Sequence, residues 1–186
     1  MTTLEETTDF LLDQFKCIEG KSEIVDGKIV TMPPTGEEPG LTSFEIASSL
    51  RDHAKTTQTG RAVPDNVGFR VNLPNRQYFS PDAAYILQQR SGSAGFINGA
   101  PVFAVEVRSE NDSGPRMELE IAQKPADYFA AGTLVVWDVN PFGEQEIVFK
   151  YSASDPQNAQ VFRRGEVADA EPAVAGWKMK VDELFA

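Results

Sequence analysis

Three residues whose side chains can do chemistry stand where apolar side chains are expected. Glu106 lies inside Pro101–Val107, the most strand-like run in the chain, and Asp82 begins a second such run directly after Pro81. Lys124 lies in a predicted helix and shares its apolar stripe with Met117, Ile121 and Tyr128, at the spacing i, i+4, i+7 and i+11. Each of the three charges therefore needs an explanation.

Each charge also has an ordinary explanation, and the residues by themselves leave both readings open. An isolated ionised carboxylate in a dry core costs several kcal/mol, so Glu106 needs a partner, a cation or a proton, unless it lies at a strand end near solvent beside Arg108. Asp82 alone fits a turn at the start of a strand. Lys124 alone fits a lysine that extends its ammonium group to solvent.

Taken together, the three residues point to metal-assisted chemistry on a phosphate. Two carboxylates at neighbouring strand ends can hold a hard divalent cation, which prefers oxygen ligands. A lysine nearby can position a water molecule and offset the charge that builds on a phosphate in the transition state.

The elements that must position these residues begin with a helix and a hairpin. Apolar residues at helical spacing predict a helix over Leu4–Ile18. Two β-branched runs around Asp26-Gly27 predict a hairpin over Glu23–Met32, because this dipeptide accepts the positive φ angles of a type I′ turn. The density of Pro and Gly in Pro33–Gly40 predicts no element there.

The rest of the chain reads as two more helices and a series of strands. A helix capped by Thr42 or Ser43 has an apolar face of Phe44, Ala47, Leu50 and Ala54. Strands are predicted over Val67–Val71, Asp82–Leu87, Pro101–Arg108, Thr133–Val139 and Gln145–Tyr151, with a last short one around Val161. A loop is expected over Arg90–Ala100, a third helix over about Arg116–Ala131, and a turn at Asn140–Gly143.

This order of elements predicts the fold class. Helices that interrupt mostly consecutive strands indicate an α/β (α+β mixed) fold, in which helices pack on a mixed β-sheet. Val102–Val107 is apolar at nearly every position, which indicates a strand buried on both faces near the centre of that sheet. Residues 1–186 show no repeat and no second domain, so we expect one domain.

Composition limits the function classes. The formal net charge of −11 argues against a general affinity for phosphate backbones or anionic membranes. One Cys and one His exclude zinc sites built from Cys and His clusters, and a His-based triad would have to use His53. With no apolar run long enough to span a membrane and an acidic N-terminus, we expect no membrane association and a cytoplasmic location, which also suits the lone Cys17.

Several short motifs resemble one family when they are taken in order. Asp82 in Ser-Pro-Asp-Ala-Ala, Glu106 in Val-Glu-Val-Arg-Ser, and Lys124 ahead of Tyr-Phe-Ala-Ala-Gly-Thr-Leu-Val-Val-Trp-Asp-Val-Asn-Pro resemble the Uma-two family of restriction endonuclease-like proteins, in the PD-(D/E)XK nuclease superfamily. Glu23 in Glu-Ile-Val-Asp-Gly, Met32-Pro-Pro-Thr-Gly36 and Gly68-Phe-Arg-Val agree. The resemblance runs from about Leu4 to Phe185.

The resemblance implies a restriction-endonuclease-like core, with two helices flanking a mixed sheet, and a nuclease that acts on DNA. Its active site would be Asp82, Glu106 and Lys124. Asp82 and Glu106 would bind Mg²⁺, with Mn²⁺ able to substitute, together with the backbone carbonyl of Val107. Lys124 would orient and activate the attacking water, and Glu23 matches an extra acidic residue beside the metal.

Two positions depart from the superfamily pattern. Arg108 stands where the superfamily usually has its lysine, and arginine cannot act as a base because it stays protonated. Lys124 matches the migrated lysine of the Uma-two family instead. Pro125 follows it directly and removes a helical hydrogen bond to Ile121, so we expect a kink or a restart of the helix there.

Two other readings stay open. The first is a catalytically inactive protein of the same fold that serves as a homodimeric binding or regulatory module, which the net charge of −11 favours. The second is a hydrolase of smaller phosphate esters, although neither a Walker-type loop nor a Rossmann fingerprint is present.

The charge is distributed unevenly along the chain: residues 39–110 carry a net +1, whereas the segments on either side carry −6 each. Trp137 and Trp177 are expected to pack in the core and tail rather than stack on bases, and His53 to lie at the surface or cap a helix.

Overall fold

A six-stranded mixed sheet forms the centre of the protein. The computed structural model describes residues 14–15, 17–87, 95–110, 115–144 and 146–185, so most of the predicted helix Leu4–Ile18 lies outside the described residues. The strands of this sheet, in spatial order, are β11 (Asp155–Arg163), β10 (Glu146–Ser152), β9 (Val135–Val139), β8 (Phe103–Val107), β6 (Ala83–Ile86) and β3 (Arg61–Pro64). Strands β8 and β9 run parallel, and the other neighbouring pairs run antiparallel.

A second, five-stranded sheet lies beside the first. Its spatial order is β2 (Lys28–Thr31), β1 (Ser22–Val25), β5 (Arg76–Phe79), β4 (Phe69–Arg70) and β7 (Ile97–Asn98). The β1–β2 hairpin is the one the sequence predicts, and its turn residues Asp26 and Gly27 adopt φ angles of 49° and 67°. Positive φ at both central residues is what a type I′ turn requires.

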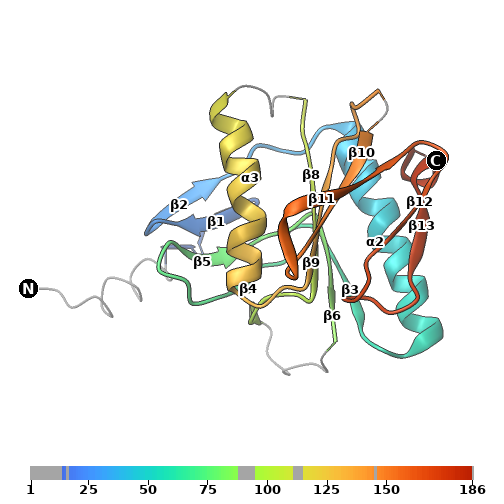
Figure 1. The fold of residues 1–186 in the computed structure, drawn as a ribbon. Helices are drawn as coiled ribbons and strands as arrows, with labels where there is room; N and C mark the ends of the chain where they lie inside the picture. Colours follow the sequence, from blue (N-terminus) through green and yellow to red (C-terminus); the bar gives the residue numbers. More distant parts are fainter. Residues whose placement is uncertain (1–13, 16, 88–94, 111–114, 145, 186) are drawn as a thin grey trace, which may run out of the picture.

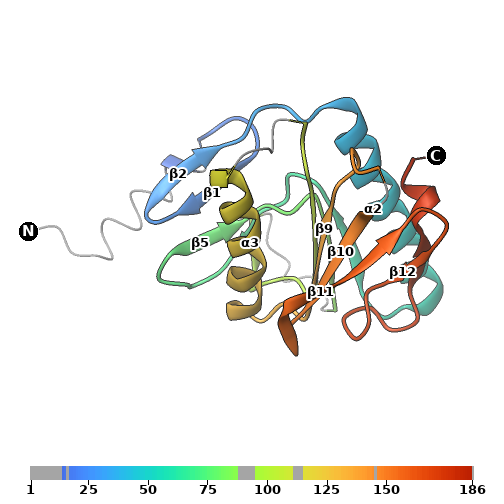
Figure 2. The ribbon, with the colours of Figure 1, turned by 45° about the horizontal axis from the view of Figure 1, so that its top comes forward.

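Two helices cover opposite faces of the six-stranded sheet. Helix α2 (Glu37–Thr57) lies on one face and α3 (Pro115–Ala130) on the other, next to the five-stranded sheet (Figures 1 and 2). The C-terminal segment, with strands β12 (Val167–Asp169) and β13 (Lys178–Lys180) and the 3₁₀ helix η1 (Val181–Phe185), packs beside α2. The mixed sheet with flanking helices that the sequence predicts is therefore present.

Alternation along the central strands divides the core into two layers. Tyr85, Val105 and Trp137 face α2 and pack with Trp177, whereas Ala84, Ala104 and Val136 face α3 and pack with Tyr128 and Phe69. The centroids of the Trp137 and Trp177 rings lie 5.0 Å apart in the α2-side layer, so both rings are core residues as predicted. Phe103, Ala104 and Val105 are fully buried, which confirms that β8 is covered on both faces.

Helix α2 begins earlier than the sequence predicts. The expectation of no element in Pro33–Gly40 is wrong for its second half, because the helix begins at Glu37, with Gly36 as its N-cap. Pro39 lies in the first turn, where its missing N–H needs no partner, and the Gly40 N–H donates to the Gly36 carbonyl at 3.0 Å. Phe44, predicted on the apolar face, is 61 % exposed.

Several strands escaped the sequence prediction because pairing, rather than pattern, makes them strands. Strand β3 is short and contains Pro64, which has no backbone N–H to donate. An edge strand tolerates proline because one of its two sides needs no ladder hydrogen bonds. Strand β5, in Arg-Gln-Tyr-Phe, has no clear alternation but pairs with β1 and β4. Strand β7 lies in the segment expected to be a loop, β12 and β13 follow the last predicted strand, and β11 is longer than the short strand expected around Val161.

No helix in the described part of the chain is both long and apolar enough to cross a membrane.

Candidate functional site

Four carboxylates lie side by side at one end of the central sheet. Glu106 on β8 pairs directly with Asp138 on β9. Continuing the antiparallel registers by one residue places Asp82 opposite Glu106, and Asp65 opposite Asp82. We call these four residues the acid row. All four lie on the face that α3 covers, since they share the alternation of Ala84, Ala104 and Val136.

Glu106 is held by two groups from α3. The Lys124 Nζ donates to Glu106 Oε2 at 2.8 Å, and the Tyr128 hydroxyl donates to Oε1 at 2.6 Å. Burial raises the pKa of Glu106 to about 7, because the neighbouring carboxylates of Asp82 and Glu23 add to the desolvation and the ammonium of Lys124 offsets only part of it. Glu106 therefore keeps its proton at a pH where a glutamate of ordinary pKa has lost it.

Lys124 is shared between two acids. Its Nζ lies 3.3 Å from Glu23 Oε1 as well as against Glu106, and its side chain is 21 % exposed. Burial opposes the charge, but the two carboxylates outweigh it and raise the pKa of Lys124 above its ordinary value. The ammonium group points into the site instead of extending to solvent.

Glu23 is the most completely paired acid of the site. Besides Lys124, it accepts hydrogen bonds from Arg76 Nη1 at 2.5 Å and from the Ser80 N–H at 3.0 Å. Burial alone would raise its pKa, but Lys124 and Arg76 hold the pKa of Glu23 below its ordinary value. Its hairpin strand, β1, pairs with β5, and this pairing brings Glu23 to Arg76.

Asp82 is anchored at the start of β6. Its Oδ2 accepts the Val107 N–H at 2.6 Å, and its own N–H donates to the Val105 carbonyl at 2.9 Å. Its Oδ1 accepts a hydrogen bond from Lys21, which also bonds Asp65 at 2.7 Å. The two carboxylates that the sequence assigns to metal binding are therefore adjacent, and each bonds a different lysine.

Lys21 is a site residue that the sequence reading missed. The carboxylates of Asp82, Glu106 and Asp65 raise the pKa of its ammonium group although burial opposes them. Lys21 stands just before the hairpin, in a stretch with no pattern of its own. The sequence offered one signal for Lys21: it stands two residues before Glu23, at the start of the same hairpin, so the two side chains would be expected to lie near each other.

Arg76 forms a buried clamp behind the site. Its Nε donates to Asp127 Oδ2 at 2.9 Å and its Nη1 to Glu23, so one guanidinium joins β5 to β1 and to α3. Asn75 adds a hydrogen bond to Asp127 at 2.9 Å. The sequence analysis did not single out Arg76, since β5 was not predicted.

Arg108 does not pair with Glu106, the partner that the ordinary reading of this strand end gave it. It donates to both carboxylate oxygens of Asp138, at 2.8 and 2.5 Å, and its guanidinium lies 5.3 Å from the centroid of the Phe149 ring. The fourth acid of the row thus has its own bidentate cation.

The structure also shows where Pro125, Tyr128 and His53 lie. Helix α3 runs as one element through Pro125, so the helix does not restart there. Tyr128 is fully buried and stacks on Phe79 with ring centroids 4.0 Å apart, which fixes the hydroxyl that reaches Glu106. His53 is half-buried on α2, with its ring centroid 6.5 Å from that of Tyr85, and takes no part in the site.

Solved structures include one of similar fold. The crystal structure of “a putative nuclease belonging to DUF820” from Anabaena variabilis ATCC 29413 superimposes with a TM-score of 0.74 at 20 % identity, covering 94 % of this chain and 96 % of that chain. At this identity the likeness bears on the fold alone, which the two chains share. No curated protein matches the sequence.

A family model matches most of the chain. The model Uma2, described as “Putative restriction endonuclease”, matches residues 12–182, a range that contains the acid row, Lys124 and both helices of the core. The family that the sequence motifs resemble is thereby confirmed. This chain belongs to the Uma2 family of restriction endonuclease-like proteins.

Proposed function

We propose that this protein is a Mg²⁺-dependent endonuclease that hydrolyses the phosphodiester bonds of DNA, with Asp82, Glu106 and Lys124 at its centre. One observation carries the proposal: the Lys124 ammonium bonds Glu106 at 2.8 Å, in a row where Glu106 stands beside Asp82. Membership of the restriction endonuclease-like family supports a nuclease and a divalent metal.

The donor set fits Mg²⁺. Asp82 and Glu106 supply carboxylate oxygens from neighbouring strands, with the Val107 carbonyl and Glu23 as further oxygen donors. Within the described residues, no three His, Cys, Asp or Glu side chains form a ready-made metal cage. Mg²⁺ is commonly held by one or two carboxylates plus water and substrate phosphate, so this pair is sufficient. The negative surroundings that raise the pKa of Glu106 are also what a cation would relieve.

The chain's own residues would then do the following. A bound divalent cation supplies Lewis-acid polarisation of the phosphate and a more acidic water. Lys124 keeps its proton, since its pKa is raised, and so it orients the attacking water and offsets phosphate charge rather than removing a proton. Tyr128 fixes the carboxylate of Glu106, and Arg76 holds Glu23 beside Lys124.

Plasmid nicking tests the proposal. Supercoiled DNA incubated with the full chain should be nicked or cut with Mg²⁺ or Mn²⁺ and left intact with EDTA. Glu106→Gln and Lys124→Met should each lower the rate by about 10²-fold or more, since each removes a group that acts on the reacting phosphate or water.

A matched control separates chemistry from stability. Lys150→Met removes another lysine with a carboxylate partner, Asp169 at 2.7 Å, on the strand pair β10–β9 away from the acid row. This variant should keep the activity. A nicking rate in Lys124→Met equal to that of the wild type would refute the assignment of Lys124.

The second candidate is a catalytically inactive homodimeric module, and one observation favours it. Each of the three acids Glu23, Asp82 and Glu106 already has an ion-pair partner among Lys21, Lys124 and Arg76 without a metal. Calorimetry with Mn²⁺ together with sedimentation distinguishes the two candidates. A dimer that takes up no Mn²⁺ and cuts no DNA would favour the module.

A further inference from the structure

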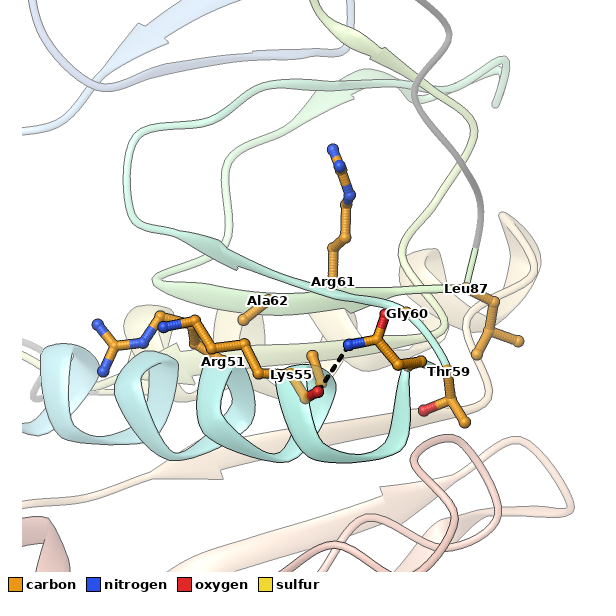
Figure 3. A pocket seen from close by; sticks show the side chains of 9 residues that line it. Arg51, Lys55, Thr59, Gly60, Arg61, Ala62 and Leu87 are labelled. Atoms are coloured by element: carbon orange, nitrogen blue, oxygen red, sulfur yellow. Dashed lines mark hydrogen bonds between the residues drawn. The ribbon is translucent and has the colours of Figure 1, made fainter.

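A basic hollow lies at the other end of the edge strand β3. It has a volume of about 660 Å³ and is lined by the end of α2, the start of β3 and the end of β6, with the cations Arg51, Lys55 and Arg61. Figure 3 shows Arg51 and Lys55 extending from α2 while Arg61 extends from β3 on the side away from the helix. Among the described residues that line the hollow there is no acid, in a protein whose net charge is −11.

The three cations of this hollow differ in how far a nearby acid neutralises them. Asp52 pairs with Arg51 at 3.0 Å and also faces Lys55. Within the described residues, Arg61 makes no ion pair. The carbonyls at the end of α2 are partly covered, since the Gln58 side chain donates to the Lys55 carbonyl at 2.7 Å and the Gln58 N–H to the Ala54 carbonyl at 2.9 Å. The helix end therefore presents cations more than bare carbonyls.

Strand β3 connects this hollow to the acid row. Arg61 begins β3 and Asp65 directly follows its last residue, Pro64. By the alternation of the strand, both lie with Val63 on the face that the acid row occupies. The four residue steps from Arg61 to Asp65 span roughly 13 Å in an extended strand. That is about four base-pair steps of duplex, which rises 3.4 Å per step. Strand β3 is the edge strand of the six-stranded sheet, so within the described residues no further strand pairs with its outer side.

We infer that the basic hollow binds backbone phosphate of DNA that extends beyond the acid row, with Arg61 as the contact on the face of the acid row and Lys55 and Arg51 as contacts from α2 on the other side of β3. This inference rests on the proposed function, because it takes DNA as the substrate. It gives an acidic protein a local cation surface at which to hold a polyanion, and it assigns a second contact outside the reacting centre.

Salt dependence of DNA binding tests the inference. Fluorescence anisotropy with a labelled 20-base-pair duplex, in EDTA so that no hydrolysis occurs, gives Kd from 25 to 200 mM NaCl. The double variant Arg61→Gln/Lys55→Gln should bind about tenfold or more weakly, and its slope of log K against log salt should fall by about 2. The same measurement with a labelled single strand, and competition by inorganic phosphate, shows whether the hollow binds the duplex, the single strand or free phosphate.

A charge-matched control is available on β13. Lys178 and Lys180 are exposed and lie on the C-terminal strand pair, so Lys178→Gln/Lys180→Gln removes the same charge elsewhere. This control should keep the slope of the wild type. An unchanged slope in the Arg61→Gln/Lys55→Gln variant, or an equal loss of slope in both double variants, would overturn the inference. Unchanged affinities of the Arg61→Gln/Lys55→Gln variant for both the duplex and the single strand would also overturn it.

The outcomes also separate this inference from the proposed function. Wild-type protein that nicks plasmid while the double variant binds DNA equally well contradicts only the hollow. Wild-type protein that binds DNA through Arg61 and Lys55 but never cuts it contradicts only the hydrolysis.

Discussion

Glu106 shows how a single residue's surroundings set its chemistry. It is a strand residue between Val105 and Val107, and desolvation together with the carboxylates of Asp82 and Glu23 raises its pKa to about 7. The ordinary value for this side chain is 4.5. The folded protein therefore binds a proton at Glu106 in a pH range where the unfolded chain has already released it.

This difference predicts a pH dependence of stability in the metal-free protein. Between pH 4.5 and about 7 the folded state binds more protons than the unfolded state, so the free energy of unfolding should fall as pH rises through this window. The loss is at most about 3 kcal/mol by the linkage of pKa to free energy. Urea unfolding in EDTA at several pH values measures it.

Two variants check that Glu106 is the group responsible. Glu106→Gln should flatten the fall between pH 4.5 and about 7, whereas the exposed Glu183→Gln should leave it in place. Glu23 acts in a different window, since its lowered pKa gives stability that is lost only as pH drops below 4.5. A slope that survives in Glu106→Gln would show that another group causes it.

Lys21 is expected to set how strongly the acid row takes a divalent cation. Its ammonium bonds both Asp65 and Asp82, so it places a positive charge directly on a proposed metal ligand. Removing that charge lowers the repulsion that an incoming cation meets. Lys21→Gln should therefore bind Mn²⁺ about tenfold more tightly in calorimetry, a change of about 1.4 kcal/mol.

Lys28→Gln on β2 serves as the comparison for Lys21→Gln, because Lys28 is exposed and belongs to the same hairpin. It should leave the Mn²⁺ affinity unchanged. Weaker Mn²⁺ binding in Lys21→Gln would mean that Lys21 mainly holds Asp82 in place.

At the scale of elements, the site depends on how two sheets and one helix are held together. Arg76 on β5 bonds Glu23 on β1 and Asp127 on α3, and all three side chains are buried. Helix α3 supplies Lys124 and Tyr128, which lie four residues apart on consecutive turns of one face. The clamp therefore fixes the helix that carries the lysine relative to the strand that carries Glu23.

Arg76→Met should destabilise the protein by about 3–5 kcal/mol, because it leaves the buried Asp127 without its cation and Glu23 with Lys124 alone. Thermal or urea unfolding measures this directly. Arg51→Met breaks the exposed pair with Asp52 and should change stability little. Similar midpoints for the two variants would show that the buried clamp contributes no more than a surface pair.

At the scale of the whole molecule, we expect residues 1–186 to unfold as one domain. The two core layers lie on opposite faces of a single sheet, and they share its strands β6, β8 and β9. The fluorescence of Trp137 and Trp177 monitors the α2-side layer, and amide hydrogen exchange in β1 and β5 monitors the five-stranded sheet. Their transitions should coincide with the loss of far-UV circular dichroism.

Two separate transitions would instead identify two folding units. Arg76→Met sharpens the test, because it removes the clamp that joins the five-stranded sheet to α3. If the sheets were independent, this variant would shift the β1 and β5 signals alone and leave the tryptophan signal where it was.

Local pattern was sufficient for much of the fold. The hairpin around Asp26-Gly27, the buried strand at Phe103–Val107, helix α3 and the β9–β10 pair follow from turn chemistry and apolar periodicity over a few residues. Strands β3 and β5 could not be predicted in this way, since pairing with β6 and β1 makes them strands. The early start of α2 was missed because a proline in a first turn reads as a breaker.

The sequence by itself determined which residues are candidates for chemistry: Asp82, Glu106 and Lys124 stand out because charges interrupt apolar patterns. Only the tertiary structure decided their partners. Lys21 reaches Asp82 across 61 residues, and Arg76 reaches Glu23 across 53. Such pairs depend on strand register and sheet order, which long-range packing fixes, whereas apolar periodicity and turn preference are properties of neighbouring residues.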